Sequence, residues 1–202
     1  MSAPCAVGGA RVVKMPAGTA GTAGAHPGPS ASAAGAAPRP APASTAPPAG
    51  TSPGTSPGPG QQGPPADQVL ALINQARSQA GRPALTFSAG LDQSASAHNL
   101  RMAGGCGLSH QCSGEPPIGT RETSAGVHWT SAGENIGEEG PVTGSTSAIA
   151  AAAVGLTQAM LNEKPPDDGH RLNILSGSFT HIGIAVYRDS SGTVWLTQDF
   201  SN

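Results

Sequence analysis

The chain has 202 residues and a formal charge of −2, and its composition changes near residue 66. The first 65 residues hold 14 of the 20 prolines and no acidic or aromatic residue. The remainder holds all 12 acidic residues against seven basic ones, a formal charge of −5. An acidic domain without a cluster of lysine and arginine argues against nucleic acid and anionic membranes as partners.

These two parts predict two kinds of structure. Residues 1–65 have too little apolar surface to offset the entropy of ordering, so we expect a disordered linker or stalk rich in Pro, Ala, Gly, Ser and Thr. Residues 66–202 have the length of one compact domain. No stretch reaches the length of a transmembrane span. Residues 1–18 lack the apolar core of a signal peptide, and the role of Cys5 and the true translation start stay open.

Hydrophobic residues at helical spacing predict three long helices in chain order, at 67–80, 88–103 and 145–162. Residues 83–87 read as a short extended connector. Glycine and proline make 104–131 loop-rich. His98, on the second helix, and His128, in the loop region, are interpreted as structural.

The C-terminal part predicts a short helix at 170–175 and two strands, at 179–187 and 194–200. Ser190, Ser191 and Gly192 supply the hairpin turn between the strands. Helices come first and strands last, without an internal repeat. This order indicates an α+β domain in which helices pack on an antiparallel sheet.

Four polar residues carry the functional question: His110, Glu134, Glu163 and His170. Two imidazoles and two carboxylates suit Zn²⁺ or a similar divalent ion, proton transfer, or a buried hydrogen-bond network. The successive spacings of 24, 29 and 7 residues form no local chelating motif, and the HExxH motif is absent. Spacing alone therefore leaves all three uses open.

Cys106 and Cys112 would close a small loop around His110. A disulfide is expected if the protein is exported. In a cytosolic protein, Cys106, His110 and Cys112 could instead be three zinc ligands.

The phrases around these residues resemble the CAP superfamily, whose SCP domains occur in cysteine-rich secretory and plant pathogenesis-related proteins. The resemblance covers about residues 68–201 and is of the bacterial type. It rests on six phrases in the family order: Leu72–Arg77, Cys106–His110, Gly133–Ile136, Met160–Pro165, Gly169–Leu175 with Phe179–Gly183, and Trp195–Phe200.

The resemblance implies a three-layer α-β-α sandwich with His110, Glu134, Glu163 and His170 as a tetrad lining one cleft. Two departures from the family are that a cysteine-rich C-terminal extension and the plant-type disulfide pattern are absent. The segment from Gly114 to Trp129 resembles an insertion before Glu134.

Three hypotheses follow. The first is a secreted or surface-displayed, monomeric binding module for a lipid, a cell-envelope component or a protein, with a metal optional on His110 and His170. The second is a metal-dependent hydrolase, a peptidase or esterase, with Glu134 or Glu163 as general base. The third is a structural polar network without turnover. The linker, the cysteine pair and the resemblance favour an extracellular location.

Overall fold

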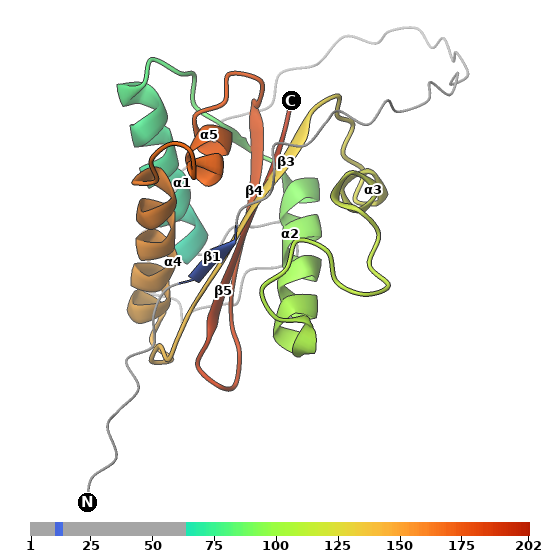
Figure 1. The fold of residues 1–202 in the computed structure, drawn as a ribbon, viewed down its shortest axis with the longest axis vertical. Coiled ribbons are helices and arrows are strands. Elements are labelled where there is room, and N and C mark those ends of the chain that lie inside the picture. The colour runs from blue at the N-terminus through green and yellow to red at the C-terminus, as the bar shows by residue number, and fades with distance from the viewer. Residues whose placement is uncertain (1–10, 14–63) are drawn as a thin grey trace, which may run out of the picture.

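The computed structural model describes residues 11–13 and 64–202 (Figure 1). Most of the predicted linker 1–65, including Cys5, lies outside these residues. The domain boundary at residue 66 therefore stays a prediction.

The centre of the fold is a five-stranded sheet. Its long strands pair antiparallel, and a two-residue strand pairs parallel at one edge. The strand order across the sheet is β1 (Arg11–Val13), β3 (Ala132–Glu139), β5 (Val194–Ser201), β4 (His181–Arg188) and β2 (Thr86–Phe87).

Helices cover both faces of this sheet (Figure 1). One layer contains α1 (Pro64–Gln79), α4 (Thr146–Leu161) and α5 (Gly169–Ile174), and the other contains α2 (Ala89–Arg101) and α3 (Ile118–Ser124). The expected three-layer α-β-α sandwich is confirmed. Two of the helix starts follow from serine caps, because Ser88 and Ser145 each accept a hydrogen bond from a backbone amide in the first turn.

The two faces of the sheet differ in polarity. The interface with α1 and α4 is the main apolar core, which includes Ile73, Leu156, Ile182, Leu196 and Phe200. On the opposite face the apolar cluster is small: Met102, Cys112, Ile136 and Trp195. The α2 layer therefore covers a compartment that polar side chains largely fill.

Three elements differ from the sequence prediction. Helix α2 ends at Arg101 and continues as a π-helical turn, η1 (Met102–Cys106), up to the first disulfide cysteine. The loop-rich region contains the short helix α3. Strand β3 was not predicted, because its sequence AGENIGEE is poor in the β-branched and aromatic residues typical of strands.

Within the described residues, no helix combines the length and apolar character that a membrane crossing requires.

Gly183 shows how closely α2 lies on the sheet. A Cβ at this position would approach the backbone nitrogen of Asp92 to 2.1 Å and the carbonyl carbon of Leu91 to 2.2 Å. We therefore predict that Gly183→Ala lowers the free energy of unfolding by about 3 kcal/mol or more, because backbone must move. Urea unfolding measures this. Gly104→Ala is the matched control, since a Cβ there meets nothing within 4 Å; equal stabilities would contradict the prediction.

Candidate functional site: two histidine–glutamate pairs at strand β3

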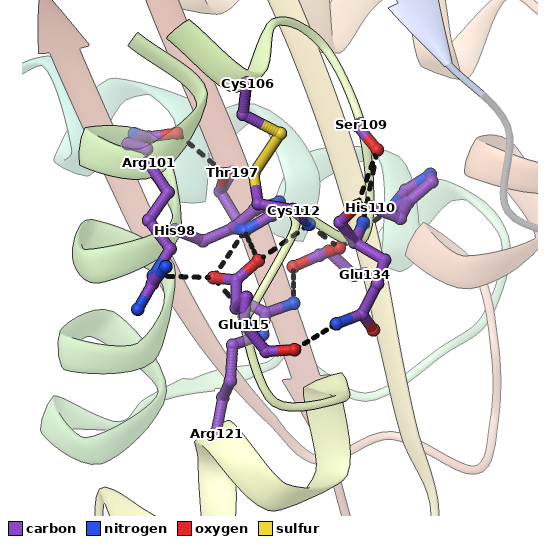
Figure 2. Close-up of polar contacts among 12 residues, drawn as sticks. His98, Arg101, Cys106, Ser109, His110, Cys112, Glu115, Arg121, Glu134 and Thr197 are labelled. Carbon is purple, nitrogen blue, oxygen red and sulfur yellow. Dashed lines mark hydrogen bonds and ion pairs between the residues drawn. A yellow bond between two sulfur atoms is a disulfide. The ribbon is translucent and has the colours of Figure 1, made fainter. Parts of the chain in front are cut away.

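His110 lies on a loop that the disulfide between Cys106 and Cys112 closes. The expected disulfide is thus confirmed, and the alternative with free thiolates on Cys106 and Cys112 is not what the structure holds. Nδ1 of His110 lies 2.8 Å from Oε1 of Glu134, which is fully buried in β3 (Figure 2). The loop therefore fixes the imidazole against the sheet.

The second pair forms between α4 and α5. Nδ1 of His170 lies 2.5 Å from Oε1 of Glu163, just beyond the end of α4. The other oxygen of Glu163 accepts the backbone N–H of His170 at 3.0 Å. One carboxylate thus accepts two hydrogen bonds, which hold both the ring and the first turn of α5.

The two pairs approach β3 from different helical layers. The amide of Asn135 donates to the carbonyl oxygen of His170 at 3.2 Å. The amide of Asn173, on α5, donates to Asn135 Oδ1 at 2.9 Å and to the carbonyl oxygen of Glu134 at 3.4 Å. The four predicted residues are therefore joined through Glu134 and Asn135, as two pairs. Their action as one site stays a prediction.

The hydrogen bonds indicate which ring nitrogen is the donor in both histidines. A carboxylate only accepts, so Nδ1 of His110 and of His170 carries a proton. A neutral ring in this tautomer has its lone pair on Nε2, the atom that a metal ion would use. A carboxylate behind the imidazole is the usual arrangement around metal-ligating histidines. Each ring thus has the carboxylate support typical of a metal-ligating histidine. That His110 and His170 hold one ion together stays a prediction.

Arg121 compensates the buried negative charge of Glu134. Its guanidinium lies 2.6 Å from Oε2 of Glu134. Burial would raise the pKa of Glu134, but the hydrogen bond with His110 and the charge of Arg121 outweigh it and keep the pKa below its ordinary value. Glu134 is thus an ionised acceptor with both oxygens engaged.

His98 and Glu115 form a further buried pair that sequence reasoning did not find. Nδ1 of His98 lies 2.9 Å from both oxygens of Glu115. Nδ1 of His98 thus has a partner 17 residues away in a loop, whereas Nε2 is buried without a hydrogen bond among the described residues. No helical spacing could indicate that contact. Figure 2 shows this pair beside the disulfide, with Arg121 below it.

His98, Cys112 and Glu115 each place one ligand-type atom within 4.8 Å of the others. The sulfur of Cys112 is bonded to Cys106, so it offers no thiolate in this state. The group is therefore a hydrogen-bonded cluster in the oxidised protein.

Two buried acids flank Glu134. Asp199 is its direct cross-strand neighbour on β5, and Glu122 lies on α3. Burial, followed by the charge of Glu134, raises the pKa of Asp199 well above its ordinary value. Burial raises the pKa of Glu122 to about 8. Glu122 is therefore largely protonated near pH 7, and the protonated form of Asp199 is favoured, whereas Glu134 favours its ionised form.

A surface groove of about 430 Å³ lies between α1, α4 and α5. Carboxamides make up much of its polar lining: Gln75, Gln79, Gln158 and Asn162. Arg171 adds a guanidinium. Asn162 and Arg171 are the chain neighbours of Glu163 and His170, but neither member of the pair lines the groove.

Comparison with known proteins identifies relatives for this domain. The model of the cysteine-rich secretory protein family, CAP, matches residues 70–200. The uncharacterized protein YkwD of Bacillus subtilis (strain 168) is 30% identical over 136 residues, which are 65% of this chain and 45% of YkwD.

Three solved structures are similar to this chain. An extracellular protein containing an SCP domain from Bacillus anthracis is 28% identical, with a TM-score of 0.54 over 68% of this chain and 40% of that one. An outer surface protein of Borrelia burgdorferi is 13% identical, with a TM-score of 0.55 over 68% and 92% of the two chains. NaASP2, solved with Zn²⁺, is 14% identical, with a TM-score of 0.52 over 72% and 83%. The last two likenesses show the fold alone. This chain spans less than half of the Bacillus proteins it matches.

Arg121→Met tests the electrostatic support of Glu134. Removing one partner of a buried ion pair leaves an uncompensated charge, so we expect the free energy of unfolding to fall by about 3–5 kcal/mol. Arg101→Met is the control, because the Arg101 side chain is 48% exposed and lies 3.7 Å from Glu115. Solvent screens this half-exposed guanidinium, so its ion pair with buried Glu115 should contribute no more than about 1 kcal/mol. Urea unfolding of both variants measures the difference, and similar losses would contradict the assigned role.

Glu122→Gln tests the neutral state of the buried acids. Between its ordinary pKa of 4.5 and about 8, Glu122 holds a proton in the folded protein that the unfolded chain releases. The folded state binds more protons, so stability falls as pH rises through this window. One such proton gives a slope of at most about 1.4 kcal/mol per pH unit.

The glutamine variant lacks this proton, and its free energy of unfolding should depend less steeply on pH between about 5 and 8. Urea unfolding across the window gives the two slopes. The exposed acid Asp67 supplies the control, since Asp67→Asn should retain the wild-type slope. A wild-type slope in Glu122→Gln would show that Glu122 is already ionised in the fold.

Proposed function

The chain belongs to the CAP family of cysteine-rich secretory proteins, and from this premise we propose that it is an extracellular binding module. Its site comprises the two His–Glu pairs, with His110 and His170 holding the ligand directly or through a divalent ion such as Zn²⁺. Of the expected partner classes of lipid, cell-envelope component and protein, the groove favours a polar component of the cell envelope.

The extracellular location has two supports. Disulfides persist in oxidising compartments, and this one closes the loop that carries His110. The Bacillus anthracis relative is described as an extracellular protein.

The arrangement of the carboxylates is the observation that carries the proposal. Glu134 accepts from His110 with one oxygen and from Arg121 with the other. Glu163 accepts from the His170 ring and from the α5 backbone. A general base needs an oxygen directed at water or substrate, whereas these oxygens are directed at protein donors. The glutamates therefore orient the histidines, and binding is favoured over hydrolysis.

A bound divalent ion would supply a Lewis-acidic contact for an oxygen of the ligand. His110 and His170 would hold it through Nε2, and Glu134 and Glu163 would keep each ring in the required tautomer. The solved NaASP2 contains Zn²⁺, which gives precedent for zinc on this fold.

The groove suggests the chemistry of the ligand. Carboxamides offer both donors and acceptors, and Arg171 prefers an anionic or carbonyl oxygen. A glycan with carboxylate or phosphate groups satisfies such a lining better than an acyl chain, which would leave the amides without partners.

Zinc titration calorimetry on the full chain tests the metal site. We expect one Zn²⁺ per wild-type chain and at least about tenfold weaker binding in His110→Ala/His170→Ala, since both proposed ligands are lost. His181→Ala is the control, because His181 is exposed and hydrogen-bonds its neighbour Thr180. Equal zinc affinity in all three proteins would remove the metal from the proposal.

Sedimentation with purified bacterial cell-wall sacculi and with phosphatidylglycerol vesicles tests the ligand class. The proposal expects wild type to pellet with sacculi, and the double histidine variant to remain in solution. Pelleting with vesicles alone would favour the lipid alternative. Turnover of a peptide or ester panel that disappears in the double variant would favour the hydrolase.

A further inference from the structure

We infer that reduction of the Cys106–Cys112 disulfide creates a second metal site, in which Cys106, Cys112, His98 and Glu115 bind Zn²⁺. This site is separate from the His110 and His170 site of the proposed function. It uses a residue pair, His98 and Glu115, that the binding proposal leaves without a role. Figure 2 shows the disulfide lying directly above this pair.

Even with the disulfide intact, three of these side chains lie close to the positions that a zinc site requires. Ligand-type atoms of His98, Cys112 and Glu115 lie within 4.8 Å of one another. Ligands of tetrahedral zinc, at bond lengths of about 2.0–2.3 Å, are separated by about 3.3–3.8 Å. To meet that requirement, the three side chains need to approach by no more than about 1–1.5 Å. All three residues are buried, so they are held in place and shielded from water.

The second ring nitrogen of His98, Nε2, suggests that this residue also has a metal-bound state. Nε2 is buried and has no hydrogen-bond partner among the described residues. It lies 3.9 Å from Oε1 of Glu134. This nitrogen therefore faces a carboxylate without forming a hydrogen bond to it. If Zn²⁺ replaces the proton on Nδ1, the ring proton moves to Nε2 and faces Glu134. A carboxylate behind the histidine is then present, as metal sites require.

Charges around the group also suit two thiolates. Zn²⁺ with two thiolates and the Glu115 carboxylate leaves one net negative charge. Arg101 and Arg121 offset it, since their Nε atoms lie 3.7 and 3.8 Å from Oε1 of Glu115. A buried anionic metal cluster would otherwise be unfavourable.

Cys106 has room to become the fourth ligand. It is exposed at the end of η1, so a reductant can reach the disulfide. Gly104 and Gly105 precede it and Gly107 follows, and a Cβ on any of these would meet nothing within 4 Å. The backbone can therefore shift while the two sulfurs separate from bonding distance to ligand spacing.

Reduction and metal binding balance in electrons and protons. A dithiol reductant supplies two electrons and two protons, its own thiols becoming a disulfide, and Cys106 and Cys112 become thiols. Zn²⁺ then displaces the two thiol protons, which pass to solvent. The disulfide and the zinc site both close the loop that carries His110, so the loop stays closed in either redox state.

Cobalt binding tests the inference on the full chain carrying His110→Ala/His170→Ala, which removes the metal site of the proposed function. The protein is reduced with a phosphine, freed of reductant without oxygen, and titrated with Co²⁺. We expect one equivalent with a thiolate-to-cobalt charge-transfer band, tetrahedral visible absorption and displacement by Zn²⁺. The oxidised protein should give no such band. Absence of this band in the reduced protein would contradict the inference without bearing on the proposed metal site at His110 and His170.

Single substitutions in the same background identify the ligands. Cys112→Ser, His98→Gln and Glu115→Gln should each weaken Co²⁺ binding at least about tenfold. His128→Gln, at an exposed histidine, should not. Unchanged affinity in both His98→Gln and Glu115→Gln would overturn the inference, because the cysteines alone would then bind. Near-ultraviolet circular dichroism reports folding, and a fold that is lost on reduction and not regained with Zn²⁺ would also overturn it.

Discussion

The buried, ionised carboxylate of Glu134 is the constraint on which the α2 side of the sheet depends, because its charge needs partners from other segments. Glu134 lies in β3 with no exposed surface, and an unpaired buried charge would be strongly destabilising. Arg121 and His110 supply the compensation from two segments outside the sheet. The short helix α3 and the disulfide-closed loop each bring one of these partners to the strand. Burial and the charge of Glu134 raise the pKa of Asp199, directly opposite on β5, so the protonated form of Asp199 is favoured beside this charge.

The two faces of the sheet therefore contribute in different ways. The face under α1 and α4 buries most of the large apolar side chains and supplies most of the stabilisation from desolvation. The face under α2 replaces such packing with hydrogen bonds and ion pairs, such as the contact between Thr197 and Asn99. Buried polar groups contribute less net stability but fix geometry closely when each finds a partner. The His110 pair belongs to this polar face, whereas the His170 pair belongs to the opposite layer.

This division explains what the sequence could predict. Helical and alternating periodicity locate α1, α2, α4 and the β4–β5 hairpin because local packing determines them. Strand β3 escapes prediction because neighbouring strands, not its own side chains, determine its conformation. The four tetrad residues were found through a family resemblance, since their spacing ranks no function. Arg121, Glu115 and Asp199 carry no local signal at all, because their roles depend on contacts between segments far apart in the chain.

The two histidines also differ in how firmly each is held. Glu163 and His170 are seven residues apart, and the end of α4 and the start of α5 place them together with bonds to ring and backbone. His110 instead depends on a loop, a disulfide and a carboxylate 24 residues away. Closing a loop with a covalent bond limits the positions its residues can take. The position of His110 therefore depends on closure of this loop, whereas that of His170 depends on two adjoining helices.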